Sequence, residues 1–184
     1  MSTDRRIVAN FFVSLDGVVE SPDKWHFRYF DDQMGQAVGA GMASADALLM
    51  GGTLYREWSE YWPAHADDDF GGFMNGITKY VVSRTLDRAD WTNTTLIRDD
   101  VAARIRELKA QPGKDIAMSG SATLARWLLA EGLLDELNLL VHPIVVGTGA
   151  RLFPDGTAQQ PLKLASSTAF GSGVLHLVYR PTPA

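Results

Sequence analysis

Residues 115–130 carry the side chains whose types and spacing are best suited to chemistry. An apolar, strand-like run passes through Ser119, Gly120 and Ser121 directly into an amphipathic helix. The first turn of a helix leaves backbone N–H groups unpaired and carries partial positive charge, and a glycine with small hydroxyl residues lets a phosphate approach closely. The same serine could act only as a helix cap. The segment therefore predicts either an anion site or a simple helix start.

Three other polar segments also follow apolar, strand-like runs. They are Asp16-Gly17, Gly51-Gly52-Thr53 and Ser83-Arg84-Thr85. In open α/β sheets the ligand lies outside the carboxyl ends of the strands, so we expect these segments and residues 119–121 to meet at one crevice. Two helix N-termini and an arginine suit the phosphates of a dinucleotide. The chain has no GxGxxG sequence, which disfavours a standard Rossmann domain.

The elements that must position these segments alternate between strand and helix over residues 7–118. Hydrophobic spacing predicts helices at 31–43, 52–58 and 101–109, a fourth that ends at Gly132, a loop or irregular helix over 63–76, and strands at 7–13, 47–50, 79–83, 94–97 and 116–118. Two further strands, 136–146 and 173–180, are separated by a polar loop. Alternation implies parallel crossovers, and the helix-free end implies antiparallel edge strands. We therefore expect one α/β domain over residues 1–184 with a mixed, mostly parallel central sheet.

The composition is that of an ordinary globular protein and excludes several functions. The 184 residues carry a net charge of -5 without a basic stripe, which argues against nucleic acid as a partner. The lack of cysteine excludes thiolate chemistry and favours a reducing cytoplasm. No secretory signal or membrane-spanning apolar run occurs, so we expect a soluble cytoplasmic protein with no membrane partner. The histidines and Asp67-Asp68-Asp69 lack metal-ligand spacing, so no metal is predicted.

Two apolar runs near the C-terminal end, 141–146 and 174–179, predict a sheet edge that needs cover. An exposed edge of this kind must be paired or shielded to avoid aggregation. Pairing across a two-fold axis, the commonest symmetric assembly, would provide that cover. We therefore expect a homodimer.

The order and spacing of the motifs resemble the dihydrofolate-reductase-like superfamily, and within it the stand-alone form of the riboflavin-biosynthesis reductase domain family. The resemblance extends over nearly the whole chain. It rests on Ser14-Leu15-Asp16-Gly17, Asp46 to Tyr55 with Tyr61-Trp62-Pro63, Val82 to Leu86, Ser119 to Leu124, Leu134 to Leu137, and Pro143 with Gly147, Gly149 and Phe153. It implies a three-layer dihydrofolate-reductase-like fold and hydride transfer from NADPH to a pteridine- or pyrimidine-like heterocycle, including ribosylaminopyrimidines.

The resemblance also implies a role for each motif. The adenosine side of NADPH would lie on Gly51, Gly52, Thr53, Leu54, Ser83, Arg84 and Thr85, and its pyrophosphate on Ser119, Gly120, Ser121, Ala122 and Thr123. Asp16 would bind or protonate the substrate near the nicotinamide. Gly17 follows it directly, and Trp25 is a further candidate for the substrate site because it lies in the loop after Asp16. Two simpler roles stay open, because Asp16 could only hydrogen-bond its own turn and Trp25 could be a loop anchor rather than a lid.

Three departures from the family pattern bear on the cofactor and the substrate. Relatives carry Gly-Arg where this chain has Gly51-Gly52, which leaves Arg84 as the candidate for the 2′-phosphate of NADPH. Ser119 stands where relatives have a glycine. Residues 34–45 contain no basic side chain, whereas riboflavin reductases proper have arginine and histidine there, and this disfavours the riboflavin substrate. A flavin- or deazaflavin-linked reductase and a nucleotide-binding module without turnover remain alternatives.

Overall fold

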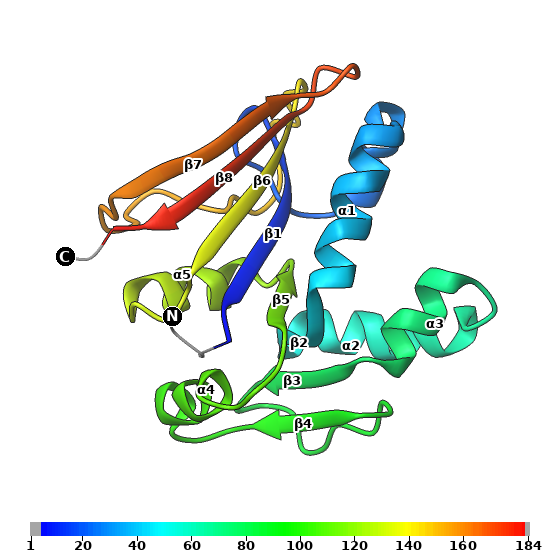
Figure 1. The fold of residues 1–184 in the computed structure, drawn as a ribbon, viewed down its shortest axis with the longest axis vertical. Helices are drawn as coiled ribbons and strands as arrows, with labels where there is room; N and C mark the ends of the chain where they lie inside the picture. Colours follow the sequence, from blue (N-terminus) through cyan, green and yellow to red (C-terminus); the bar gives the residue numbers. More distant parts are fainter. Residues whose placement is uncertain (1–4, 183–184) are drawn as a thin grey trace.

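The computed structural model describes residues 5–182, which form a sheet with helices on both faces (Figure 1). The strands of this part of the chain are β1 (Ile7–Ser14), β2 (Ala45–Gly51), β3 (Thr78–Val82), β4 (Thr94–Ile97), β5 (Asp115–Ser119), β6 (Glu136–His142), β7 (Leu162–Ala169) and β8 (Leu175–Pro181). Their order across the sheet is β4-β3-β2-β5-β1-β6-β8-β7. The apolar strand β1 lies inside the sheet, where both of its faces are covered.

The direction of the strands decides where a ligand can sit. Neighbouring strands from β4 to β6 pair in parallel, whereas β8 runs antiparallel to both β6 and β7. This confirms the expected mixed, mostly parallel sheet with antiparallel strands at its C-terminal edge. Because the parallel strands point the same way, their carboxyl ends lie on the same side of the sheet. The segments that follow β3, β2, β5 and β1 therefore begin next to one another there.

The helices form two layers against the sheet. They are α1 (Asp32–Ser44), α2 (Gly52–Tyr61), α3 (Asp69–Gly76), α4 (Val101–Lys109) and α5 (Ala122–Ala130). Side chains alternate along β2, so Leu48 and Met50 pack with α2 and α3 while Ala47 and Leu49 pack with α4 and α5. Met34 of α1 packs against Phe12 and its neighbours on the α2 face. This arrangement confirms the three-layer fold.

Capping residues account for several helix boundaries. The Asp31 carboxylate accepts a hydrogen bond from the Met34 N–H at 2.9 Å and starts α1 as expected. Gly132, with φ of 66°, follows the end of α5. The region expected to be a loop or irregular helix contains α3 and most of a 3-10 turn, Trp62–His65. No helix within residues 5–182 is long and apolar enough to cross a bilayer.

Two expectations about the C-terminal part are wrong. Residues 162–169 form the edge strand β7 rather than part of a polar loop. Most of its side chains are exposed and many are polar, so it lacks the apolar pattern by which a strand is recognised, and its backbone pairing with β8 holds it in place. The strand expected over 136–146 ends at His142, because Pro143 has no N–H to donate to a ladder.

Candidate functional site

A cleft of about 1380 Å³ lies at the carboxyl ends of β2, β3 and β5. Most residues predicted to hold the cofactor line it, namely Gly51, Gly52, Thr53, Leu54, Ser83, Arg84, Ser119, Gly120, Ser121, Ala122 and Thr123. Thr85 lies outside the lining, and its hydroxyl oxygen accepts a hydrogen bond from Arg56 Nη2 at 3.0 Å. Asp16, Gly17 and Trp25 are also outside it. The structure therefore brings three of the four predicted polar segments to one cleft.

Ser121 joins the two helix starts in this cleft. Its hydroxyl oxygen accepts a hydrogen bond from the Gly51 backbone N–H at 2.9 Å, which ties the end of β2 to the loop before α5. Ser121 has a left-handed backbone with φ of 55°, and no side chain in the described part of the chain caps α2 or α5. The serine therefore precedes α5 without capping it. First-turn N–H groups of both helices are left for a ligand.

Gly52 and Gly120 permit the close packing around these helix starts. A Cβ atom at position 52 would lie 2.6 Å from the Ser83 hydroxyl oxygen, well inside contact distance. A Cβ atom at Gly120, where φ is 71°, would lie 3.3 Å from Leu54 Cδ2. The arginine that the family pattern has at position 52 would therefore require Ser83 to move.

Two arginines line the cleft beyond α2. Arg84 follows β3, and Arg98 follows the neighbouring strand β4. The Arg98 guanidinium donates a hydrogen bond to the Leu86 carbonyl oxygen, which holds this side chain against the turn after β3. The Ser83 hydroxyl oxygen accepts from the N–H groups of Thr85 and Leu86, both at 3.2 Å, and shapes the same turn. Sequence reasoning missed Arg98, although its place directly after a predicted strand was an available signal.

The Asp16 carboxylate is held by the loop after β6. It accepts hydrogen bonds from the Ser14 hydroxyl at 2.6 Å and from the N–H groups of Val146 and Gly147 at 3.0 and 2.9 Å. The Ser14 hydrogen bond, followed by those of the loop, lowers the pKa of Asp16 to about 2. Gly17, with φ of 85°, donates to the Ser14 carbonyl oxygen at 3.0 Å. Both residues shape the end of β1, and their contact with a substrate stays a prediction.

Trp25 is packed as an anchor of the loop after β1. Its side chain is buried, and its indole N–H donates to the Glu20 carbonyl oxygen at 3.2 Å. Its ring meets the His142 ring edge-on, with 5.3 Å between the ring centroids. This packing agrees with the anchor role, and a lid role would require the loop to move.

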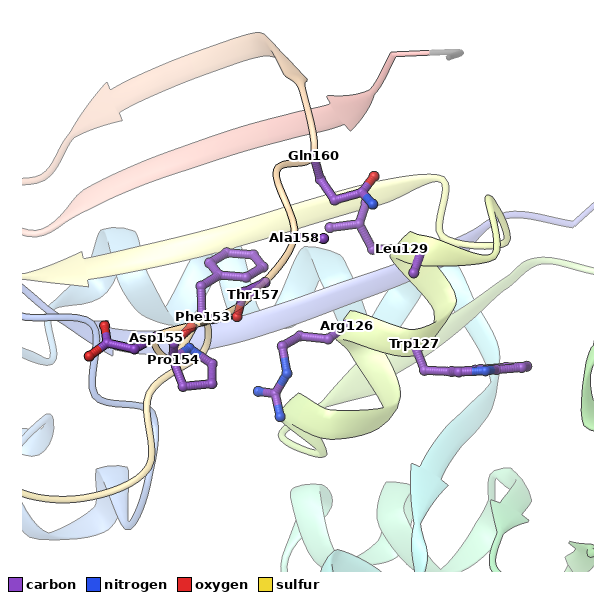
Figure 2. A pocket seen from close by; sticks show the side chains of 11 residues that line it. Arg126, Trp127, Leu129, Phe153, Pro154, Asp155, Thr157, Ala158 and Gln160 are labelled. Atoms are coloured by element: carbon purple, nitrogen blue, oxygen red, sulfur yellow. Dashed lines mark hydrogen bonds between the residues drawn. The ribbon is translucent and has the colours of Figure 1, made fainter.

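Arg126 separates the cleft from a smaller pocket of about 370 Å³ between α5 and residues 153–160. Its guanidinium donates to the Leu152 carbonyl oxygen at 2.8 Å and to Thr123 Oγ1 at 3.0 Å. Figure 2 shows the side chain extending from α5 toward Pro154, so it ties the helix to this segment. Sequence reasoning missed Arg126, although its position three residues after Thr123 on one helix was a signal.

The end of the cleft near β1 is lined by Glu20, Asp23 and Arg151, which sequence reasoning did not place in the site. They come from the loop after β1 and from residue 151 of the segment paired with it through a bridge to Val18. Their types alone gave no signal, because exposed charged residues in loops are common. Within residues 5–182 no group of three histidine, aspartate or glutamate side chains could hold a metal ion.

Comparison with known families identifies the relatives of this fold. A profile of the RibD C-terminal domain matches residues 5–176. The chain belongs to the RibD C-terminal domain family. It is similar to the uncharacterized protein YyaP of Bacillus subtilis (strain 168), with 33% identity over 180 residues that cover 95% of this chain and 94% of that protein.

Solved structures share the RibD C-terminal domain fold at low sequence identity. A putative riboflavin biosynthesis protein from Shewanella sp. PV-4 has a TM-score of 0.77 at 18% identity, covering 97% of this chain and 99% of that chain. A diaminohydroxyphosphoribosylaminopyrimidine deaminase/5-amino-6-(5-phosphoribosylamino)uracil reductase from Thermotoga maritima has a TM-score of 0.68 at 14% identity, covering 97% of this chain and 57% of that chain. These similarities confirm the expected reductase fold.

Proposed function

We propose that this RibD C-terminal domain is an NADPH-dependent reductase of a small pteridine- or pyrimidine-like heterocycle. The observation that carries the proposal is the pair of uncapped helix N-termini, joined by Ser121 and Gly51, that open into one cleft. Helix N-termini of this kind stabilise phosphate groups through free N–H donors and the helix dipole. A cleft with two such sites suits a dinucleotide better than a ligand with a single charge.

The residues of the cleft fit the separate parts of NADPH. The first turns of α2 and α5 would hold the pyrophosphate, since Gly52 and Gly120 let the neighbouring backbone approach without a side chain. Arg84 and Arg98 lie toward β3 and β4 and would hold the 2′-phosphate. The bound cofactor supplies a hydride. The chain itself would orient the nicotinamide and exclude water with apolar side chains such as Phe12 at the β1 end.

Cofactor titration tests this proposal. Trp58 and Trp127 line the cleft, so their fluorescence should report a ligand that enters it. We expect NADPH to bind with micromolar affinity and to be oxidised when an acceptor heterocycle is added. A yellow protein with bound flavin would support the flavin- or deazaflavin-linked alternative. Tight nucleotide binding without turnover of any pteridine or pyrimidine would support the binding module, and no binding of NADPH or NADH would remove the hydride-transfer function.

We also propose that the protein is a cytoplasmic homodimer. The apolar run 174–179 does not form the sheet edge that was expected, because β8 pairs with β6 on one side and β7 on the other, and the edge strand is β7. Leu164 of β7 and Leu175 of β8 are 48% and 42% exposed. Covering such side chains with a second copy would shield this edge. Light scattering on the purified protein should give the mass of two chains, and charged substitutions at both leucines should give the mass of one.

A further inference from the structure

The end of the cleft near β1 carries two carboxylates that face the space beyond the helix N-termini. Glu20 and Asp23 both line the cleft there, in the loop between β1 and α1. The sheet order places this end away from Arg84 and Arg98, which follow β3 and β4. If the dinucleotide lies as proposed above, on which this inference rests, the reacting ring and the substrate occupy the Glu20 end.

One hydrogen bond orients the exposed Glu20 carboxylate. Its Oε2 accepts a hydrogen bond from the Ala150 N–H at 2.6 Å, and its own carbonyl oxygen accepts one from Trp25 Nε1 at 3.2 Å. Val19, the preceding residue, donates its N–H to the Ala150 carbonyl oxygen at 2.9 Å. Gly149, with φ of 116°, lets the two segments approach, because a Cβ atom there would lie 2.9 Å from Val18 Cγ1. One carboxylate oxygen is thus anchored while the other keeps its lone pairs for a ligand.

The basic residues at the same end are already engaged. Arg151 Nε donates to the Asp16 carbonyl oxygen at 3.0 Å, and its Nη2 lies 3.9 Å from Asp16 Oδ2, so a carboxylate offsets its charge. The Arg126 guanidinium is directed at Leu152 and Thr123, as described above. A phosphate placed at this end would meet two carboxylates and a guanidinium that is already directed at Asp16. A group with N–H donors would instead find an oriented acceptor.

We propose that the Glu20 carboxylate binds the substrate by accepting hydrogen bonds from it. The substrate would then be a heterocycle with amino or ring N–H donors and no phosphate at this end. Asp23 adds negative charge that repels phosphorylated competitors. The sequence predicted Asp16 for this role. In the structure the Asp16 carboxylate lies outside the cleft lining and accepts hydrogen bonds from Ser14, Val146 and Gly147.

The test compares two probes by calorimetry in the absence of NADPH, so that it stays separate from the cofactor titration. 2,4,6-Triaminopyrimidine presents N–H donors in every orientation of its ring, and ribose 5-phosphate presents a phosphate. Wild type and variant are compared for each probe, because the helix N-termini proposed to hold the pyrophosphate would also bind ribose 5-phosphate. We expect the wild type to bind the triaminopyrimidine. Glu20→Gln keeps an acceptor for the Ala150 N–H but removes the charge, so it should weaken that binding by about tenfold or more, the scale of a charge-assisted hydrogen bond.

A matched control variant accompanies this test. Glu60→Gln makes the same chemical change on α2 outside the cleft and should leave binding of the triaminopyrimidine unchanged. Equal binding of the triaminopyrimidine by wild type and Glu20→Gln, weaker binding of ribose 5-phosphate by Glu20→Gln, or no binding of the triaminopyrimidine would each overturn the proposal. If Glu20→Gln does not fold, Glu20→Asp, which draws the carboxylate back by one methylene, takes its place with the same expected loss of triaminopyrimidine binding.

Discussion

The Ser121 hydroxyl oxygen and the Gly51 backbone N–H, 2.9 Å apart, hold the starts of α2 and α5 in one arrangement although 70 residues separate them in the chain. The bond uses the serine side chain for tertiary structure instead of helix capping. Because of it, the free N–H groups of two helices face one cleft at fixed spacing. The geometry of the proposed pyrophosphate site therefore depends on a single hydroxyl.

Ser121→Ala should weaken both the fold and cofactor binding. Loss of the acceptor leaves the Gly51 N–H without its partner, which should lower the free energy of unfolding by about 1 kcal/mol. NADPH affinity should fall as well, because the two helix starts are no longer tied. Thermal unfolding and fluorescence titration measure the two effects. Ser59→Ala on the exposed side of α2 is the control and should change neither; an unaltered Ser121→Ala protein would contradict the prediction.

Gly52→Ala should destabilise the protein through a contact with Ser83. The added Cβ would lie 2.6 Å from the Ser83 hydroxyl oxygen, and such overpacking costs about 1–3 kcal/mol. Replacing Ser83 with glycine should relieve the clash, so the double variant should be more stable than the sum of the single changes predicts. Chemical denaturation of the four proteins measures this coupling. Additive changes would mean that the two residues do not meet in solution.

Arg84→Ala should weaken NADPH binding more than NADH binding. A hydrogen bond to a charged phosphate contributes about 1.5–3 kcal/mol to the binding free energy. NADH has no 2′-phosphate, so its binding does not include this hydrogen bond and should change less. Fluorescence titration with both cofactors gives the difference. Arg88→Ala is the matched control, because Arg88 pairs with Asp90 at an exposed position outside the cleft. Equal losses for both cofactors would move the 2′-phosphate role to Arg98.

Asp16 should make the stability of the fold depend on pH in the acid range. Its pKa is lowered to about 2 in the folded protein, so the folded state favours the carboxylate more than the unfolded state does. This contribution is present above the unfolded pKa of about 4 and is lost as the pH falls toward the folded value. Asp16→Asn should therefore flatten that part of the profile of unfolding free energy against pH. A profile identical to that of the wild type would show that these hydrogen bonds do not stabilise the fold.

Much of the fold could be predicted because its strands and helices carry strong local patterns. The strand at 94–97 and the helix at 101–109 match β4 and α4 residue for residue, since apolar spacing marks both. β7 could not be found this way. Its exposed, partly polar sequence is held by backbone pairing with β8, and backbone pairing leaves no trace in residue type.

The residues of the candidate site could likewise be predicted only in part. The glycines and serines after β2 and β5 were predictable, because a helix start next to a buried strand is a local feature. Glu20 could not be predicted, since its place in the cleft depends on Ala150, 130 residues away. Asp16 illustrates the opposite case. Its position at a strand end suggested chemistry, but long-range bonds to residues 146 and 147 turn its carboxylate away from the cleft lining.

His26 and His142 should make the fold less stable as the pH falls below neutrality. Both rings are buried with 6.0 Å between their centroids, and His26 stacks on Phe12 at 4.4 Å. Burial lowers the pKa of each histidine, so the folded state disfavours the protonated ring. The unfolded chain binds more protons below its histidine pKa of about 6.5, and stability must therefore decline as the pH falls through that value.

His26→Phe preserves the stack but cannot titrate, so its melting temperature should depend less on pH between neutral and mildly acid buffer. Phe27→Leu alters the packing on His26 but keeps both titrating groups, so its melting temperature should still fall as the pH falls. A His26→Phe profile parallel to the wild type would contradict the role of this ring.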